Sequence, residues 1–158
     1  MTVAVGELSG SREAGDTLIA HALGSCVAVI VRDRAHGACA VAHVVVPGPP
    51  PPVGAVGLPA YYASVGVPAV LDALGRLGGH LGLPPDVVLI GGASLVDGLA
   101  GFNVGRRNVL AVRRALWAVG IVPIAEDVEG TLSRTVTVDV ATGAIRVRNP
   151  SLGTWSVD

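Results

Sequence analysis

The chain has 158 residues, of which 51% are hydrophobic and 15% are charged, and its formal net charge at pH 7 is -1. This size and composition predict a single folded domain over residues 1–158 with a sizeable apolar core, and they argue against intrinsic disorder. The near-neutral charge gives no reason to expect nucleic acid or an acidic membrane surface as the main partner. All eleven basic residues are arginines, so a lysine nucleophile is excluded.

The sequence carries no pattern typical of export or membrane insertion. Its first residues include acidic side chains and lack the basic and then apolar pattern of a signal peptide. An uncharged stretch runs from Gly37 to Leu71, but the run PGPPPP and further glycines and prolines interrupt it, which argues against a membrane span. Cys26 and Cys39 have neither metal-ligand nor disulfide-framework spacing. We therefore expect a soluble cytoplasmic protein.

Four strands are predicted in the first part of the chain. They cover Thr2–Glu7, Thr17–Ala22, Val27–Arg32 and Ala38–Val46. The segment Asp33–Gly37 has the composition of a hairpin turn, so we expect the last two strands to pair antiparallel. The proline-rich segment PGPPPPVGAVGLP follows and predicts a loop, because neither a helix interior nor a central strand accommodates it.

Two helices are predicted further along. The first covers about Tyr61–Gly79, with Pro68 tolerated only near its first turn. Its expected apolar positions are Val65, Ala69, Leu71, Leu74 and Leu77. The second lies within NVGRRNVLAVRRALWAVG and ends at Gly120. Its expected apolar side consists of Val109, Val112, Leu116 and Val119.

Four further strands complete the pattern. One is expected between the helices, at Asp86–Ile90, and three follow the second helix, at Ile121–Asp127, Arg134–Val140 and Ala144–Arg148. Strands that precede and follow the helices in this way predict an α+β fold of packed, largely antiparallel β-sheets with two flanking helices.

The stretch HALGSCVAV places Cys26 directly after a Gly24-Ser25 turn, at the start of a strand. A cysteine attacks as the thiolate, which needs a neighbouring imidazole or another positive field. If the hairpin forms, His43 meets Cys26 from the partner strand despite their separation of seventeen residues. Backbone N–H groups around Gly24 and Ser25 could then face the oxyanion of an attacked carbonyl.

The same residues also have a structural interpretation. A free cysteine is a common core residue, and a lone histidine in an apolar strand is more often a satisfied structural group than a base. Cys39, which alanines flank in mid-strand, is expected to be a core residue. Spacing alone leaves the catalytic and the structural interpretations of Cys26 and His43 open.

The motifs LGSCVAV, AHVVVP, GGAS, GRRN and DVATGAIRV resemble, in this order and at similar spacing, those of the CheD chemoreceptor glutamine deamidases. The resemblance covers nearly the whole chain, and it implies a fold related to deamidases of the cytotoxic necrotising factor type. It also implies that Cys26 is the nucleophile and His43 the base, with no metal or organic cofactor.

The resemblance further implies a reaction and two kinds of partner. The reaction hydrolyses glutamine side-chain amides of methyl-accepting chemotaxis receptors to glutamate and ammonia, as part of chemotaxis adaptation. The receptors are therefore the implied substrates, and a CheC-type phosphatase is an implied docking partner.

One residue departs from the family pattern. In the family a threonine six residues before the cysteine orients the histidine, whereas this chain has Ala20 there. Strand alternation places Thr17 and His21 on the face opposite to Ala20, so a backbone carbonyl would have to take over. If orientation is missing, Ala20→Thr should raise activity. An activated Cys26 should also react with alkylating agents below the pH at which an ordinary thiol does.

Further residues are candidates for site borders or partner contacts. Gly91 and Gly92, in GGAS, are expected to turn the chain beside the site. Asn108 is unfavourable among helix formers, which predicts a hydrogen bond from its side chain to a neighbouring loop. Arg106 and Arg107 belong to a run of arginines on the second helix, which is either a solvated face or a docking surface for acidic receptor helices or the phosphatase.

Three functions remain open from the sequence. The first is an active cysteine-dependent glutamine deamidase, a protein-glutamine glutaminase. The second is a weakly active or non-catalytic CheD-like adaptor that docks on a CheC-type phosphatase or on receptors, and Ala20 favours it. The third is a different cysteine hydrolase that acts on a small amide or ester, because a fold alone does not determine a substrate.

Overall fold

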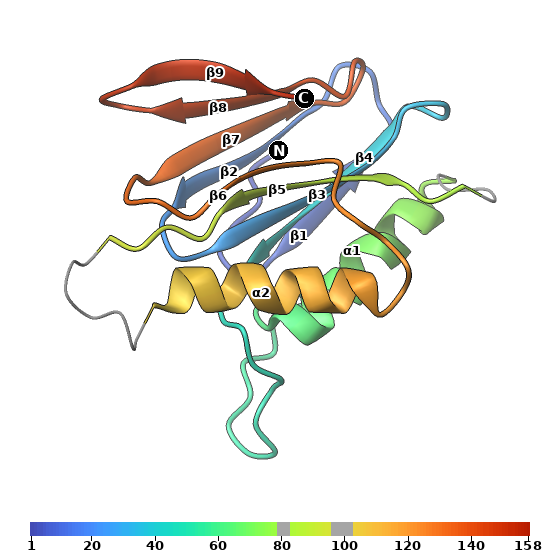
Figure 1. Cartoon of the computed structure of the whole chain (residues 1–158). Coiled ribbons are helices and arrows are strands. Elements are labelled where there is room, and N and C mark those ends of the chain that lie inside the picture. The colour runs from blue at the N-terminus through green and yellow to red at the C-terminus, as the bar shows by residue number, and fades with distance from the viewer. Residues whose placement is uncertain (79–82, 96–102) are drawn as a thin grey trace.

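A computed structural model of the chain describes residues 1–78, 83–95 and 103–158 (Figure 1). These residues form two sheets and two helices, which confirms the predicted α+β class. The five-stranded sheet has the spatial order β1 (Leu8–Ser11), β4 (Ala38–Val44), β3 (Val27–Asp33), β5 (Asp86–Gly91) and β6 (Ala125–Val128). The four-stranded sheet has the order β2 (Thr17–Leu23), β7 (Arg134–Asp139), β8 (Ile145–Asn149) and β9 (Gly153–Val157). The helices are α1 (Ala63–Arg76) and α2 (Val104–Trp117).

The elements are arranged in three layers, with the five-stranded sheet in the middle (Figure 1). Helices α1 and α2 cover one of its faces and the four-stranded sheet covers the other. The central strand β3 has an unbroken apolar run because both of its faces are buried. Val27, Val29 and Val31 face the helices, and Ala28 and Ile30 face the four-stranded sheet.

The strand pairing agrees with the prediction of largely antiparallel sheets. Among the paired strands of the described residues, β5 and β6 alone run parallel, and α2 lies between them in the chain. The hairpin of β3 and β4 is antiparallel, as expected, and it places Ala28 opposite His43.

The prediction of a first strand at Thr2–Glu7 is wrong. Its residues form only an isolated bridge between Thr2 and Ile19, and β1 begins at Leu8. Gly6, whose φ is +78°, turns the chain here, and its N–H donates to the His43 carbonyl at 3.0 Å. The N–H of Val3 donates to the Ile19 carbonyl at 2.7 Å. The N-terminal segment, residues 1–7, therefore bridges β2 and β4.

The last strands also differ from the prediction. The strand β6 begins at Ala125 rather than at Ile121, because the Ile121 N–H bonds back to the Leu116 carbonyl at 3.0 Å and Pro123 has no N–H to donate. The strand β9 was not predicted, because GTWSV contains a glycine and two small polar residues among its five.

Helix α1 buries a face that agrees only in part with the prediction, since Leu74 is buried and Leu71 and Leu77 pack against the core. Its buried residues are Ala63, Gly66, Val67, Val70 and Leu74, whereas Val65 is 39% exposed. Pro68 lies in the second turn rather than the first. Its ring removes one hydrogen bond to the Ser64 carbonyl, and because Ser64 is exposed, water can bind that carbonyl instead. The predicted end of this helix, Gly79, lies outside the described residues.

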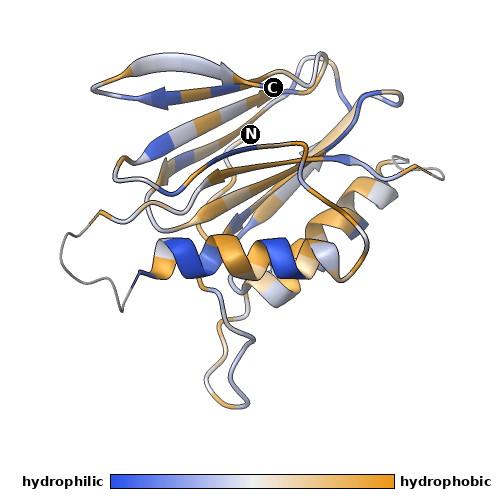
Figure 2. Ribbon diagram, viewed as in Figure 1, coloured by the Kyte–Doolittle hydropathy of each residue, from blue (hydrophilic) through white to orange (hydrophobic). Residues whose placement is uncertain are grey.

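Helix α2 largely follows its prediction. Its buried residues are Gly105, Asn108, Val109, Val112 and Leu116, and polar and apolar residues alternate along it (Figure 2). Val119 is an exception, since it lies beyond the helix and is 57% exposed. The helix ends at a cap on Ala118, and Gly120, with φ of +76°, turns the chain two residues later.

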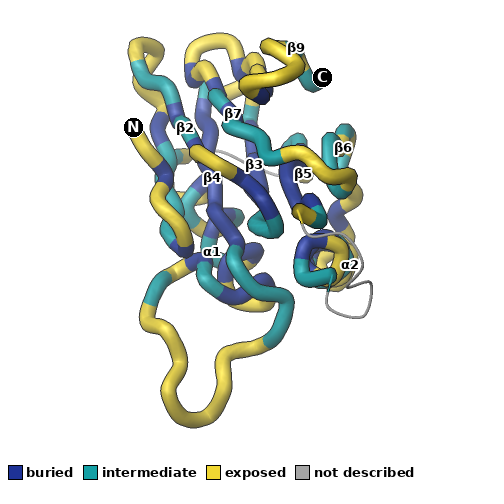
Figure 3. The backbone as a smooth tube through the Cα atoms, turned by 90° about the vertical axis from the view of Figure 1, so that its left-hand side faces the viewer, coloured by how far each residue is buried: buried dark blue, intermediate teal, exposed yellow. Residues whose placement is uncertain are grey.

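The proline-rich segment forms a loop after β4, as predicted, and residues 49–57 are exposed (Figure 3). Within the described ranges, none of the helices has the length and apolar character needed to cross a membrane.

Candidate active site

The hairpin brings Cys26 and His43 to the same face of the five-stranded sheet. His43 is opposite Ala28, and Cys26 comes two residues before Ala28, so the two side chains are diagonal neighbours across the strand pair. Cys26 is half-buried and packs against the apolar layer between the two sheets. The candidate nucleophile therefore lies at the rim of this layer, with His43 inside it.

His43 is held by a backbone carbonyl of the N-terminal segment. Its side chain is almost fully buried, and Nδ1 lies 3.2 Å from the Val3 carbonyl oxygen. A carbonyl only accepts hydrogen bonds, so Nδ1 carries the proton and Nε2 is the basic nitrogen. Nε2 has no hydrogen-bond partner among the described residues, so the Cys26 thiol does not bond to it in the resting chain. His43 is therefore in the Nδ1–H tautomer, whose Nε2 atom can accept a proton.

Burial shifts both titrating groups toward their neutral forms. It raises the pKa of the Cys26 thiol above 9.0, against a smaller lowering by the backbone N–H of Cys26. It lowers the pKa of His43 below 6.5, against a smaller raising effect of the Val3 carbonyl. At pH 7 the resting pair is thus a thiol and a neutral imidazole. These directions favour an ordinary thiol over one that reacts with alkylating agents at unusually low pH, and the alkylation profile stays a prediction.

The Gly24-Ser25 turn is bonded to the loop that follows β5. The Gly92 N–H donates to the Cys26 carbonyl, and the Ala93 N–H donates to the Gly24 carbonyl, each at 2.8 Å. A Cβ atom on Gly91, whose φ is +113°, would lie 2.3 Å from the Cys26 carbonyl oxygen. Only glycine fits there, and the predicted turn at GGAS does lie against the cysteine turn.

Asn108 joins α2 to the residues just before β3 and just after β4. Its side chain is fully buried, and Nδ2 donates to the Ser25 and Val45 carbonyls at 2.8 Å each. The predicted hydrogen bond from Asn108 to a neighbouring loop is present, and a second one reaches the residue two places after His43. Gly105 allows α2 to approach the loop after β5 closely, because a Cβ there would lie 2.4 Å from the Ala93 carbonyl oxygen.

The position that departs from the family pattern faces the same layer as His43. Ala20 is fully buried among the residues that pack between the two sheets. Thr17 and His21 lie on the other face of β2, as alternation predicts, and His21 is exposed. The candidate orienting group is instead the carbonyl of Val3, a residue that no sequence signal singled out, because every residue carries a carbonyl.

The arginines of α2 lie outside the cysteine turn. Arg106 and Arg107 are exposed, and Arg113 donates from Nε to Glu126 at 2.9 Å. A groove of about 250 Å3 runs beside the helix, and Arg107, Leu110 and Arg114 line it together with Pro47 and Gly48. Pro47 and Gly48 follow the strand that carries His43. Whether these arginines bind a partner stays a prediction.

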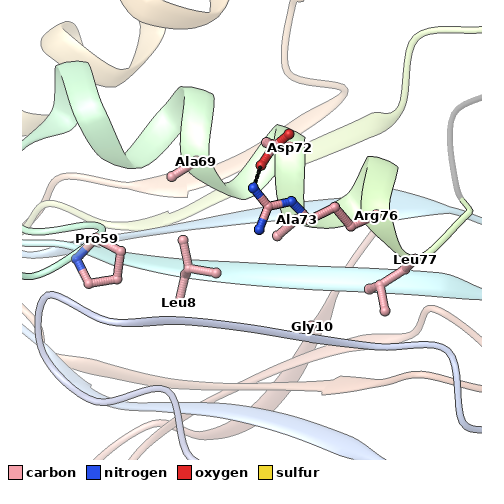
Figure 4. A pocket seen from close by; sticks show the side chains of 8 residues that line it. All are labelled: Leu8, Gly10, Pro59, Ala69, Asp72, Ala73, Arg76 and Leu77. Carbon is pink, nitrogen blue, oxygen red and sulfur yellow. Dashed lines mark ion pairs between the residues drawn. The ribbon is translucent and has the colours of Figure 1, made fainter.

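A second groove has a volume of about 430 Å3 (Figure 4). It is lined by Leu8, Gly10, Pro59, Ala69, Asp72, Ala73, Arg76 and Leu77. Asp72 and Arg76 form an ion pair of 2.8 Å at its rim. This groove opens between β1 and α1, on the helix side of the five-stranded sheet, whereas Cys26 and His43 face the other side. It is therefore separate from the candidate active site.

Within residues 1–78, 83–95 and 103–158, no three histidine, cysteine or acidic side chains are grouped so that they could hold a metal ion. Near Cys26 the fold places the imidazole of His43 on the neighbouring strand and the amide of Asn108, which bonds to the carbonyl of the preceding residue, Ser25. Together these groups can support nucleophilic attack on a carbonyl carbon.

Comparison with known proteins places the chain in a family. Residues 49–149 match the family model described as CheD chemotactic sensory transduction. The chain is 36% identical to the probable chemoreceptor glutamine deamidase CheD of Syntrophotalea carbinolica, over 99% of this chain and 98% of that protein. It is 34% identical to the chemoreceptor glutamine deamidase CheD of Thermotoga maritima, over 92% of this chain and 89% of that protein. The chain belongs to the CheD family.

Proposed function

We propose that this protein is a chemoreceptor glutamine deamidase that acts through Cys26 and His43. The observation that carries the proposal is the state of His43, whose Nδ1 is fixed by Val3 while its basic Nε2 faces the layer that Cys26 borders. The substrate class comes from the relatives, which are named chemoreceptor glutamine deamidases. The substrates would be glutamine side chains on the chemotaxis receptors, and the products would be glutamate and ammonia.

The mechanism begins from a neutral pair. His43 accepts the thiol proton at Nε2 as the Cys26 sulfur attacks the δ-carbon of the glutamine. The carbonyl oxygen becomes an oxyanion, and backbone N–H groups of the cysteine turn stabilise it. The C–N bond then breaks, and ammonia leaves with the proton from the imidazolium. Water, activated by the neutral imidazole, hydrolyses the thioester to glutamate and regenerates the thiol.

The Val3 carbonyl takes the place of the family threonine in this proposal. An orienting group fixes the tautomer and the ring plane of a catalytic histidine, and it also stabilises the imidazolium that forms. A carbonyl oxygen that accepts from Nδ1 does both, because it forbids the other tautomer and carries partial negative charge. Ala20 is then compatible with catalysis.

The test is ammonia release from a purified receptor cytoplasmic fragment. We expect release with the wild-type chain and none above background with Cys26→Ala. Cys39→Ala is the matched control, because Cys39 is a buried cysteine in the same layer, and it should retain activity. Equal release by wild type and Cys26→Ala would contradict the proposal.

The adaptor function is the second candidate, and two observations favour it. Ala20 cannot orient a histidine, and the Cys26 thiol is not bonded to Nε2 in the resting chain. An adaptor would bind receptor fragments or a CheC-type phosphatase with the same affinity in wild type and Cys26→Ala. Binding together with an absence of ammonia release would therefore assign the adaptor function.

A further inference from the structure

We propose that Asn108 is a positioning residue that builds the oxyanion site of Cys26 and holds this site against the strand that carries His43. The proposal rests on the proposed function, because it concerns the same thiol. The Asn108 side chain, in α2, is fully buried, and its amide donates both protons, one to the Ser25 carbonyl and one to the Val45 carbonyl.

The first bond determines where the Cys26 N–H points. The Ser25 carbonyl, which accepts from Asn108 at 2.8 Å, belongs to the same trans peptide as the Cys26 N–H. In a planar trans peptide the C=O and N–H groups point in opposite directions. With the carbonyl held toward α2, the N–H points away from the helix, and α2 covers the face opposite to the layer against which Cys26 packs.

That direction is the one an oxyanion donor needs. A donor must face the position where the carbonyl oxygen of the substrate gains charge, which is beside the attacking sulfur. The backbone N–H of Cys26 lowers the pKa of the thiol, against the larger raising effect of burial. Asn108 also draws electron density from the Ser25 carbonyl, which makes the linked N–H a stronger donor.

The second bond connects the nucleophile turn with the base strand. The Val45 carbonyl, two residues after His43, accepts the other Nδ2 proton at 2.8 Å. One rigid amide group therefore spans the two backbone segments that carry the proposed thiol and imidazole. The assignment of the amide is unambiguous, because both neighbouring atoms are acceptors and only the NH2 end can face them.

Stability alone does not explain an asparagine at this position. Asparagine is a poor residue for the interior of a helix, and the buried Asn108 Oδ1 atom has no hydrogen-bond partner within residues 1–78, 83–95 and 103–158. A buried acceptor without a partner is unfavourable. An asparagine at this position is therefore expected where the position of the two bonded carbonyls matters for chemistry.

The experiment separates reactions that form an oxyanion from one that does not. Acylation of Cys26 by p-nitrophenyl acetate forms an S–C bond, passes through an oxyanion and expels p-nitrophenolate. Alkylation by iodoacetamide forms an S–C bond and expels iodide without an oxyanion. The rates are measured for wild type and for Asn108→Ala, with Cys26→Ala as the blank and mass spectrometry to locate the modification.

We expect the ratio of acylation to alkylation rates to fall by about 100-fold in Asn108→Ala. Asn108→Leu has a similar volume and a higher helix propensity, and it should show the same fall while it remains folded. The control is Asn103→Ala, which removes the helix cap that accepts from the Arg106 N–H and touches neither hairpin strand. It should lower the unfolding temperature and leave the ratio unchanged.

A ratio within about threefold of wild type in a folded Asn108 variant would overturn the proposal. If neither variant folds, hydrogen exchange in the wild type decides, because both Nδ2 protons should be protected, and rapid exchange would also overturn it. Failure of the proposed function has a different outcome: the receptor fragment releases no ammonia, while the ratio still falls with the small ester.

Discussion

The buried imidazole of His43 determines how the proposed chemistry responds to pH. Its pKa is lowered by burial, so the ring is neutral at pH 6.5 and above, and the Cys26 thiol, whose pKa is raised by burial, stays protonated beyond pH 9.0. A mechanism that needs a neutral base and a protonated thiol is active between these two limits.

We therefore expect kcat/KM to form a broad plateau, with an acid limb centred below pH 6.5 and an alkaline limb centred above pH 9.0. A resting thiolate–imidazolium pair would instead give half-maximal alkylation of Cys26 well below pH 9.0. Stopped-time assays of ammonia release and iodoacetamide uptake across this range measure both quantities. Alkylation that is already maximal at neutral pH would contradict the neutral pair.

The Val3 contact changes the expectation for Ala20→Thr. With Nδ1 already bonded, threonine supplies no missing acceptor, and its two extra heavy atoms must enter a fully buried site. We expect activity within about threefold of wild type and a loss of about 1–3 kcal/mol in the free energy of unfolding. Ammonia release and urea denaturation measure the two effects, and a tenfold gain in activity would show that His43 lacks an orienting partner.

Among single residues, the sequence identifies the reactive side chains better than the groups that orient them. Cys26 and His43 have reactive side chains and a spacing that a hairpin explains, so both were accessible to sequence reasoning. The Val3 carbonyl was not, because the backbone is the same at every position and the contact spans 40 residues. Asn108 lies between these cases, since its poor fit in a helix was visible but its two acceptors were not.

Close packing of α2 against the loop after β5 is the element-level feature that supports the cysteine turn. Gly105 approaches the carbonyls of both Gly92 and Ala93 within a distance that excludes a side chain. The same loop donates the hydrogen bonds that hold the Gly24-Ser25 turn. The position of α2 is therefore coupled to the position of Cys26.

This coupling predicts different effects for alanine at two helical glycines. Gly105→Ala forces α2 away from the loop, and we expect it to lower the free energy of unfolding by about 2–3 kcal/mol and to reduce activity. Gly75→Ala, in the open part of α1, should raise stability by about 0.5–1 kcal/mol and leave activity unchanged. Denaturant titrations of both variants measure this contrast, and equal effects would refute it.

The elements that sequence reasoning recovered are those with strong local signals. Strands β3, β4 and β5 are apolar runs bounded by turns, and α2 has a clear apolar side. The N-terminal segment and β9 were assigned wrongly because tertiary pairing, rather than propensity, determines their conformation. In α1 most residues are apolar or small, so periodicity did not distinguish the buried face from the exposed one.

For the whole molecule, a buried arginine links the two sheets. The side chain of Arg32, in the central strand β3, is fully buried. It donates hydrogen bonds to the Gly143 carbonyl and to the Asp158 carboxylate. The carboxylate is next to β9, so the ion pair joins the middle of one sheet to the edge of the other. The bond from Arg32 holds the pKa of Asp158 below 3.8.

We expect Asp158→Asn to lower the free energy of unfolding at pH 7 by about 2 kcal/mol, because it leaves a buried cation with a weaker partner. A carboxylate with a lowered pKa stabilises the fold fully above pH 3.8, and the difference from the variant should vanish as the pH falls through the lowered value. Asp72→Asn, which breaks an exposed ion pair, is the control and should change stability by less than about 0.5 kcal/mol. Chemical denaturation across pH tests this, and equal losses would contradict it.

The contacts that complete the candidate site differ greatly in sequence separation, and this has a consequence for the order of folding. The hairpin that carries Cys26 and His43 closes over a four-residue turn, whereas the bonds of Val3 and Asn108 span 40, 63 and 83 residues. Local contacts form early and distant ones late. We therefore expect a growing chain to bring the two reactive side chains together before it can orient them. We expect hydrolytic competence to appear only with the last docking step, so unfinished chains would be harmless to other glutamine-bearing proteins.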